Sequence, residues 1–278
     1  YDEAIAGGFI QKFSLFAFFG FIFFSKIKNI NTKIYILTII FFIIFISIIF
    51  TGNRMPLILF ILNLLFIIII NKKLKKYLGH FLISFFIISI LTINLSVDLK
   101  RYYDEFYLQS AKIISLYSYR VTGIGSDLVY KERPFYIHEF DAGFSTFKLN
   151  KFIGGGIKSF RFNCPKRQIK NRERTSCNMH PHNYYIEILT DLGIFGFLIF
   201  LSLITLVLYK TYKVLIYSNS KYYFSPFFYI FLMEIFPLRS SGSFFTTNNA
   251  VLIFFTLGVI VSFLKYKNWR SHGESNPD

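Results

Sequence analysis

The feature that most constrains this chain is the length of its apolar blocks, in which Ile, Leu and Phe follow one another with few polar interruptions. A helix needs roughly 20 apolar residues to cross about 30 Å of hydrocarbon. Four blocks approach or exceed that length: residues 34–50, 81–97, 186–209 and 250–264. Three more segments are shorter or contain polar side chains: residues 9–24, 57–70 and 224–238. We therefore predict an all-α polytopic membrane protein with about seven transmembrane helices.

The placement of the positive charges predicts how this protein is oriented. The formal net charge is +16, which in a water-soluble protein would raise the question of nucleic-acid binding. Here the positive side chains gather in alternate short loops: Lys26, Lys28 and Lys33; Lys72, Lys73, Lys75 and Lys76; Lys210, Lys213 and Lys221; Lys265, Lys267 and Arg270. The positive-inside rule assigns these loops to the cytoplasm and the long connection 98–182 to the outside. The charges therefore indicate a membrane topology and give little support to a nucleic-acid partner.

The predicted helices divide the chain into four parts. Residues 1–97 hold transmembrane helices 1–4, residues 98–182 form a large periplasmic loop domain, residues 183–264 hold helices 5–7, and residues 265–278 form a cytoplasmic tail. Within the loop, residues 98–119 have apolar side chains at helical spacing and are predicted to form a helix. The chain begins without methionine, and its opening residues do not resemble a signal peptide. We therefore expect a fragment whose N-terminal helices are missing.

Both cysteines of the chain, Cys164 and Cys177, lie in the predicted outer loop. Disulfides form and persist on that side of the membrane, so we favour a disulfide between them. Two unpaired thiols are the alternative. Metal binding by the cysteines with His180 and His182 is a weaker third option, because the chain contains no CxxC spacing.

The segment HPHNYYIEILTDLGIFGFLIF, residues 180–200, places two histidines and an asparagine where the outer loop enters a long apolar block. Pro181 disfavours a helical conformation at His180, and Asn183 is a good N-cap residue. The chain can therefore run as one helix over residues 184–209, with His182 at its N-terminus on the outer membrane surface.

Four further residues of this predicted helix form a set that a purely structural helix rarely needs. Glu187 and Asp191 are four apart and share one face of its first turns. Gly193 and Gly196 leave small positions where a neighbouring helix can approach closely. A functional site is one explanation. A surface histidine at His182 and solvated interfacial carboxylates are an equally supported alternative when spacing alone is considered.

The same segment resembles the signature of the O-antigen ligase family, in which a histidine is followed by Asn, Ser or Gln, nine residues, Gly, two residues and Gly. The matching residues are His182, Asn183, Gly193 and Gly196. Thr51–Leu59 resembles the family's outward-facing arginine turn, which makes Arg54 the matching arginine. Gly154–Cys164 resembles the glycine-rich part of the loop that precedes the histidine. The likeness extends from Ile34 to Leu264.

The resemblance implies a GT-C-like membrane architecture and a glycosyl transfer that needs no metal or other cofactor. The donor would be a glycan on undecaprenyl pyrophosphate, at the periplasmic face of the bacterial inner membrane. His182 would act as the general base that removes the proton from the acceptor hydroxyl. Arginines would stabilise the negative charge that grows on the leaving pyrophosphate.

The sequence offers several arginines for this pyrophosphate clamp. Arg54 is the first choice and Arg239, in a short outer loop, is the second, with an interfacial anchor as the alternative for Arg239. Family members also carry an arginine shortly before the glycine-rich segment, where this chain has His138. Arg161 or Arg120 could supply that charge, and we rank Arg161 higher because it is nearer the glycine-rich segment.

Two reactions share this chemistry. A ligase transfers the finished glycan to lipid A core in lipopolysaccharide biosynthesis, whereas a polymerase transfers the growing O-antigen or exopolysaccharide chain to another lipid-linked repeat unit. We favour the ligase because the histidine motif is closer to that of ligases. A transporter of a lipid-linked anion is a third hypothesis. It predicts ionisable groups at mid-membrane, where Glu234 is the only plausible candidate.

Overall fold

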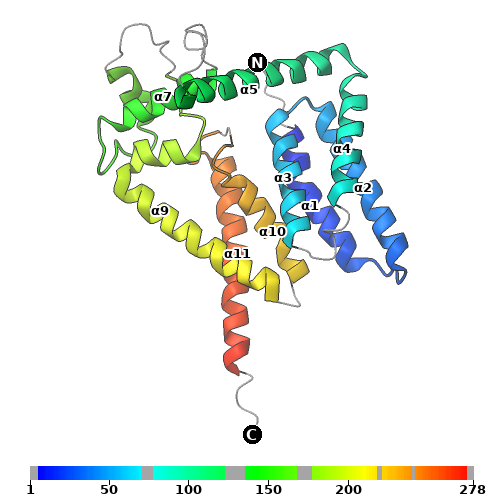
Figure 1. Ribbon diagram of the computed structural model, residues 1–278. Coiled ribbons are helices and arrows are strands. Elements are labelled where there is room, and N and C mark those ends of the chain that lie inside the picture. The colour runs from blue at the N-terminus through cyan, green and yellow to red at the C-terminus, as the bar shows by residue number, and fades with distance from the viewer. Residues whose placement is uncertain are drawn as a thin grey trace. The chain divides into compact units, whose positions relative to one another are not determined.

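The computed structural model describes residues 6–70, 78–122, 135–167, 177–217, 221–239 and 242–273, and every regular element in these ranges is helical. Its elements are shown in Figure 1: α1 (Ala6–Phe24), α2 (Ile30–Phe50), α3 (Arg54–Ile70), α4 (Leu78–Ile93), α5 (Val97–Thr122), α7 (Phe135–Phe147), α8 (Phe160–Asn163), the 3₁₀ helix η2 (Cys164–Lys166), α9 (Tyr184–Tyr217), α10 (Lys221–Glu234) and α11 (Thr247–Gly273). The all-α prediction is therefore confirmed for the described residues. Several residues named in the sequence predictions are not among the described ones: Lys72, Lys73, Lys75, Lys76, residues 274–278, and the side chains of Arg120, Lys221, Lys267 and Arg270.

Each of the seven predicted segments contains a helix, and four helices within the described ranges are long and apolar enough to cross a membrane. These four are Ala6–Phe24, Asn31–Phe50, Tyr184–Ile216 and Thr247–Lys265. The helices α3, α4 and α10 are shorter, with 17, 16 and 14 residues. The chain is therefore a membrane protein with four candidate spans among its described residues, and seven crossings stay a prediction.

The block 81–97, expected to be one long helix, is divided. α4 ends at Ile93 and α5 begins at Val97. The side-chain amide of Asn94 donates a hydrogen bond of 2.7 Å to the carbonyl oxygen of Ile90. Such local side-chain bonds compete with the helical ladder and favour a helix end. α5 then covers the helix predicted over residues 98–119.

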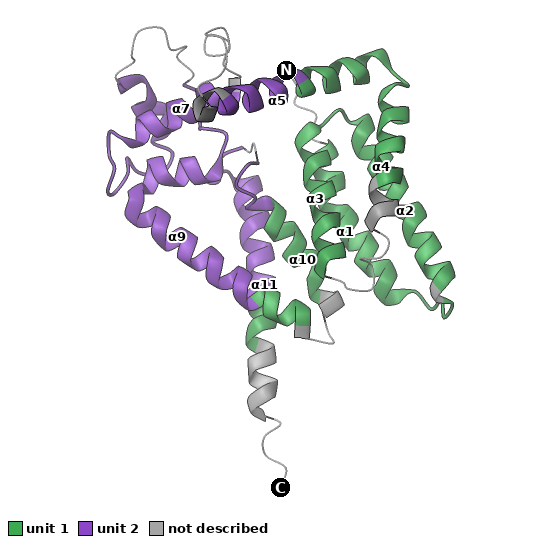
Figure 2. Ribbon diagram, in the orientation of Figure 1, with its two compact units in different colours: residues 1–107, 211–233, 262–278 green, residues 108–210, 234–261 purple. Residues whose placement is uncertain are grey.

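The chain forms two compact units, coloured green and purple in Figure 2. The first comprises residues 1–107, 211–233 and 262–278. In it α2 packs against α1, α3 and α4. Its core consists of Phe41, Phe45, Ile48, Ile49, Leu57 and Phe60. The three-residue turn between α2 and α3 contains Gly52 at φ 69°, so Arg54 begins α3 directly after a tight turn.

The second unit comprises residues 108–210 and 234–261. It holds the C-terminal half of α5, α7, α8, η2, most of α9, the α10–α11 connection and the first half of α11. α7 packs against α8 and η2 around a small core of Ala142, Phe160 and Cys164. This unit contains the histidine motif, and the candidate site is built in it.

Candidate functional site

A disulfide joins the chain before the histidine motif to η2. Cys164 and Cys177 form this bond, with their Cα atoms 5.7 Å apart, as the sequence favoured. Both sulfur atoms are engaged, which excludes metal binding by the two thiolates in this state. The bond fixes residues 177–182 against the core of Ala142 and Phe160, and so it sets the path by which the chain reaches α9.

Replacing both cysteines by serine is expected to lower the free energy of unfolding of the second unit by about 3 kcal/mol, because the bond closes a loop of 13 residues' separation. Chemical denaturation of the purified protein in detergent, followed by far-UV circular dichroism, measures this change. Reduction of the unaltered protein should reproduce it. Equal unfolding curves for the double variant and the parent would contradict the prediction.

α9 is interrupted at Gly193, which has φ 66° and ψ −171°. Figure 1 shows the helix changing direction between its yellow-green start and its yellow continuation. The prediction of one continuous helix over residues 184–209 is therefore wrong at this residue. Gly193 is not a small position for helix packing, as the sequence suggested, but the residue at which the helix breaks.

The glycine-rich segment forms hydrogen bonds with the backbone groups that the interrupted helix leaves without helical partners. In a continuous helix the carbonyl groups of Thr190 and Asp191 would accept from the N–H groups of residues 194 and 195. Here they accept from Gly155 and Gly156 at 3.0 and 2.9 Å. The N–H groups at 194 and 195 donate instead to the carbonyl oxygens of residues 151 and 152, at 2.9 and 3.3 Å. The break therefore leaves these four groups satisfied.

Side chains strengthen this junction, and its close backbone contact requires glycine. The Asp191 carboxylate accepts hydrogen bonds from the Lys158 N–H at 2.6 Å and the Ser159 hydroxyl at 3.0 Å. A Cβ atom on Gly154 would overlap the Asp191 carbonyl, and one on Gly193 would overlap the carbonyl of Phe152. Two of the three segments that carried the family resemblance, the histidine motif and Gly154–Cys164, are thus joined in one structural unit.

Replacing Gly193 by alanine is expected to destabilise the second unit by about 1–3 kcal/mol, because alanine at this φ is strained and its Cβ atom overlaps backbone. Gly258→Ala in α11 is the matched control, because a Cβ atom there meets nothing within 4 Å and alanine favours a helix. Thermal unfolding of the two variants in the same detergent compares them. Equal midpoints would show that the break tolerates a side chain.

Asn183 caps α9 directly after His182, as the sequence predicted. Its Oδ1 atom accepts hydrogen bonds from the N–H groups of Tyr185 and Ile186 at 3.0 and 3.2 Å. His182 has a φ of 50°, an uncommon conformation for a residue with a side chain, at the point where the chain turns into the helix. The backbone thus holds His182 at the first helical turn.

The first turn of α9 also holds the connection between α10 and α11. The Asn183 amide donates to the carbonyl oxygen of Pro237 at 2.7 Å. The Glu187 carboxylate accepts from the Ser243 hydroxyl at 2.5 Å and from the Phe244 N–H at 2.6 Å. These bonds to both ends of the connection fix the loop that carries Arg239.

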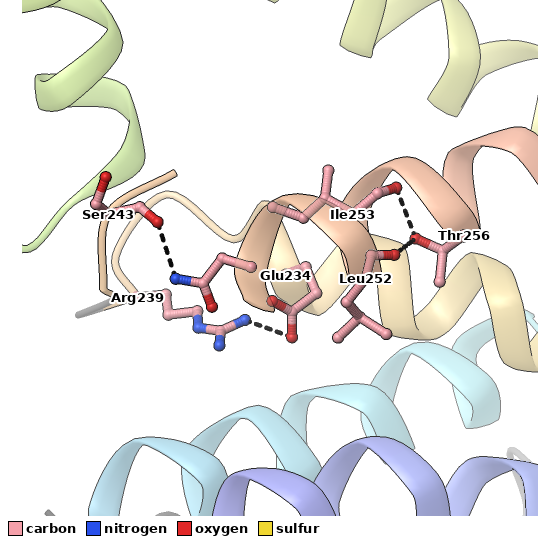
Figure 3. Close-up of polar contacts among 7 residues, drawn as sticks. Glu234, Arg239, Ser243, Leu252, Ile253 and Thr256 are labelled. Carbon is pink, nitrogen blue, oxygen red and sulfur yellow. Dashed lines mark hydrogen bonds and ion pairs between the residues drawn. The ribbon is translucent and has the colours of Figure 1, made fainter. Parts of the chain in front are cut away.

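Arg239 forms a buried ion pair with the last residue of α10. Its Nη1 atom lies 2.7 Å from the Oε1 atom of Glu234, which is fully buried. Figure 3 shows the guanidinium group pointing toward this carboxylate. Arg239 is itself largely buried, with 14% of its side chain exposed. The pair sets the direction of the arginine side chain.

His182 lies beside a buried carboxylate from α7. Its Nε2 atom is 3.5 Å from the Oε1 atom of Glu139, which is 3% exposed. Asn178 donates a hydrogen bond of 2.7 Å to the same oxygen. Burial raises the pKa of Glu139, while the positive charge of a protonated His182 and the Asn178 hydrogen bond act in the opposite direction. A negative Glu139 would stabilise a protonated imidazole at this position.

Close packing at Gly143 brings α7 to the histidine. A Cβ atom on Gly143 would overlap the side chain of Ile186, so α7 lies against the start of α9. Glu139 is one helical turn before Gly143 and shares its face. The ring of His180 is also near, with its centroid 4.4 Å from that of His182.

The sequence profile of a family described as O-antigen ligase matches residues 39–201, which is more than half of the 278-residue chain. The chain belongs to the O-antigen ligase family. No curated protein and no solved structure gives a significant match. The matched part of this O-antigen ligase family member includes His182, Asn183 and the break at Gly193. Arg239 and Glu234 lie beyond it.

The other two arginines expected in the clamp have described contacts of their own. Arg54 belongs to the first unit, where its Nη2 atom is 3.5 Å from the Oε2 atom of Glu105. Arg161 lies exposed on α8, with its guanidinium carbon 4.6 Å from the centre of the Phe162 ring. Among the described contacts of this O-antigen ligase family member, none joins Arg161 to His182 or Arg239.

The contacts of Glu139 and Asn178 were not evident from the sequence, in which Glu234 stood out only as an isolated intramembrane charge. Glu139 follows His138 in the stretch YIHEFDAGF, which we had compared with the family only for its missing arginine. A glutamate one turn before a glycine was the available signal. That spacing alone could not indicate which helix the face would meet.

Proposed function

We propose that this protein transfers a glycan from undecaprenyl pyrophosphate to an acceptor at the periplasmic face of the bacterial inner membrane. Lipid A core is the favoured acceptor, which makes the reaction the ligation step of lipopolysaccharide biosynthesis. Membership of the O-antigen ligase family supports this class of reaction. The observation that carries the proposal is the position of His182 at the start of α9, 3.5 Å from the buried carboxylate of Glu139.

In this mechanism the acceptor hydroxyl oxygen attacks the anomeric carbon of the donor. The new glycosidic bond forms while the bond from that carbon to the pyrophosphate oxygen breaks, and the electron pair leaves with undecaprenyl pyrophosphate. His182 takes the hydroxyl proton as general base. Glu139 then stabilises the resulting imidazolium, in the way that a buried carboxylate supports a catalytic histidine elsewhere.

The arginines stabilise the leaving group without a metal ion. Arg239 is held by the α9 cap and by Glu234, so its guanidinium is oriented before the donor binds. A preorganised cation of this kind stabilises charge that develops in the transition state. Arg54 and Arg161 are further candidates for the same role. The transporter hypothesis relied on Glu234 as an ionisable group at mid-membrane. The ion pair with Arg239 gives this carboxylate a structural role instead.

Complementation tests the proposal. The gene is expressed in a host that lacks its own O-antigen ligase, and lipopolysaccharide is resolved on a gel. We expect glycan-capped lipopolysaccharide from the wild type. His138→Ala is the matched control for His182→Ala, because His138 lies next to Glu139 in the chain and has no described contact with His182. Failure in this host together with restored chain length in a polymerase-deficient host would make the protein a polymerase.

A further inference from the structure

The loop between α7 and α8 presents large apolar side chains to its surroundings. Ile153 is 80% exposed and Phe152 is 66% exposed, and Leu149 and Ile157 are also exposed. We call these four residues the apolar tip. Large apolar side chains exposed together in one loop are a signal of contact with a protein or a membrane.

The apolar tip is joined to the lipid-facing part of α9. Before the break at Gly193 the helix is buried in its own unit, whereas after it Phe195, Leu198, Ile199 and Leu203 are exposed along one face. An exposed apolar face on a helix long enough to span the membrane faces lipid. The ring centroids of Phe152 and Phe195 are 6.2 Å apart, and the Phe195 N–H donates to the Phe152 carbonyl oxygen. The tip is therefore fixed where this face begins.

Positively charged residues accompany the apolar tip in the sequence. The exposed side chains of Lys148, Lys158 and Arg161 flank it, and that of Lys151 lies between Leu149 and Phe152. Residues 148–162 contain no aspartate or glutamate. Long cationic side chains beside apolar residues match the boundary between acyl chains and lipid phosphates.

We propose that the apolar tip inserts into the bilayer beside α9, with Lys148, Lys151, Lys158 and Arg161 at the level of the lipid phosphates. The rigid backbone junction at Gly193 and the Asp191 contacts join the tip to the start of α9. The tip is thus a further attachment of this unit to the membrane, in addition to its candidate spans in α9 and α11, and it fixes the height of the histidine motif above the lipid. This inference does not depend on the glycan-transfer reaction.

Fluorescence quenching by brominated lipids tests the insertion. The chain has one tryptophan, Trp269, which is first replaced by phenylalanine. Ile153→Trp in that background is reconstituted into phosphatidylethanolamine and phosphatidylglycerol vesicles. Phosphatidylcholine brominated at shallow or deep acyl positions is then included. Leu198→Trp reports a lipid-exposed position on α9, and Tyr136→Trp reports an exposed aromatic position on α7.

We expect shallow bromine to quench the tryptophan at position 153 at least about half as strongly as it quenches the one at position 198, and several-fold more strongly than the one at position 136. Phe152→Trp provides a second report should the first variant fold poorly. Quenching at position 153 no greater than at position 136 would overturn the proposal. Blue-shifted, unquenched emission that depends on protein concentration would also overturn it and assign the tip to a second protein copy.

Discussion

Replacing His182 by alanine is expected to lower the kcat/KM of glycan transfer by about 10²–10⁴-fold, the usual contribution of a positioned general base. The expected loss is in kcat, because the imidazole acts on the proton that moves in the transition state. A reconstituted assay with purified lipid-linked donor and lipid A core acceptor measures both constants. His138→Ala should transfer at the rate of the wild type. Activity of His182→Ala within a few fold of wild type would assign the base to another residue.

Glu139 is expected to act through His182, and a double-mutant cycle separates this role from a structural one. Glu139→Gln removes the negative charge but keeps the size of the side chain and an oxygen for the Asn178 hydrogen bond. We expect it to lower kcat and to leave the KM for the donor unchanged. In the His182→Ala background the same substitution should have little further effect, because residues that act as one unit are not additive. Additive losses would indicate that Glu139 supports the fold alone.

The sequence predicted those parts of the fold that depend on local physics. Apolar block length located the seven helical segments, and the three-residue turn before Arg54 follows from Gly52 between two such blocks. The cap at Asn183 is equally local, because its hydrogen bonds reach only two and three residues along the chain.

The break in α9 could not be predicted in the same way. Apolar residues continue on both sides of Gly193, and a glycine inside such a block is typical of close helix packing. The hydrogen bonds that replace those lost at the break come from Gly155, Gly156 and the carbonyl groups of residues 151 and 152. These residues lie far away in the sequence. A helix interruption is visible in sequence only when its compensating partners are also local.

The two carboxylates of α9 illustrate the same limit. Their spacing of four predicted a shared face, and both are buried. Their partners differ, however, because Glu187 binds Ser243 and Phe244 while Asp191 binds Lys158 and Ser159. Each carboxylate fixes one loop to the helix that begins after His182. The spacing predicts that the two carboxylates share a helix face. Only the tertiary contacts show which loop each carboxylate binds.

Replacing Arg239 by alanine is expected to lower kcat by about 10²–10³-fold, comparable with the loss of one preorganised donor to a developing negative charge. Arg239→Lys should retain part of the activity, because lysine keeps the charge but lacks the forked guanidinium geometry. Arg101→Ala is the matched control, since Arg101 is 66% exposed and pairs with Asp98 on the surface of α5.

The ion pair with Glu234 complicates this substitution, because a buried carboxylate without its partner destabilises a fold by about 3–5 kcal/mol. The double variant Arg239→Ala/Glu234→Gln removes both charges and is expected to recover the thermal stability that Arg239→Ala loses. Its transfer rate should stay as low as that of the single variant, because the pyrophosphate still lacks its cation. Recovery of activity together with stability would show that Arg239 serves only to neutralise Glu234, and the clamp would then rest with Arg54 and Arg161.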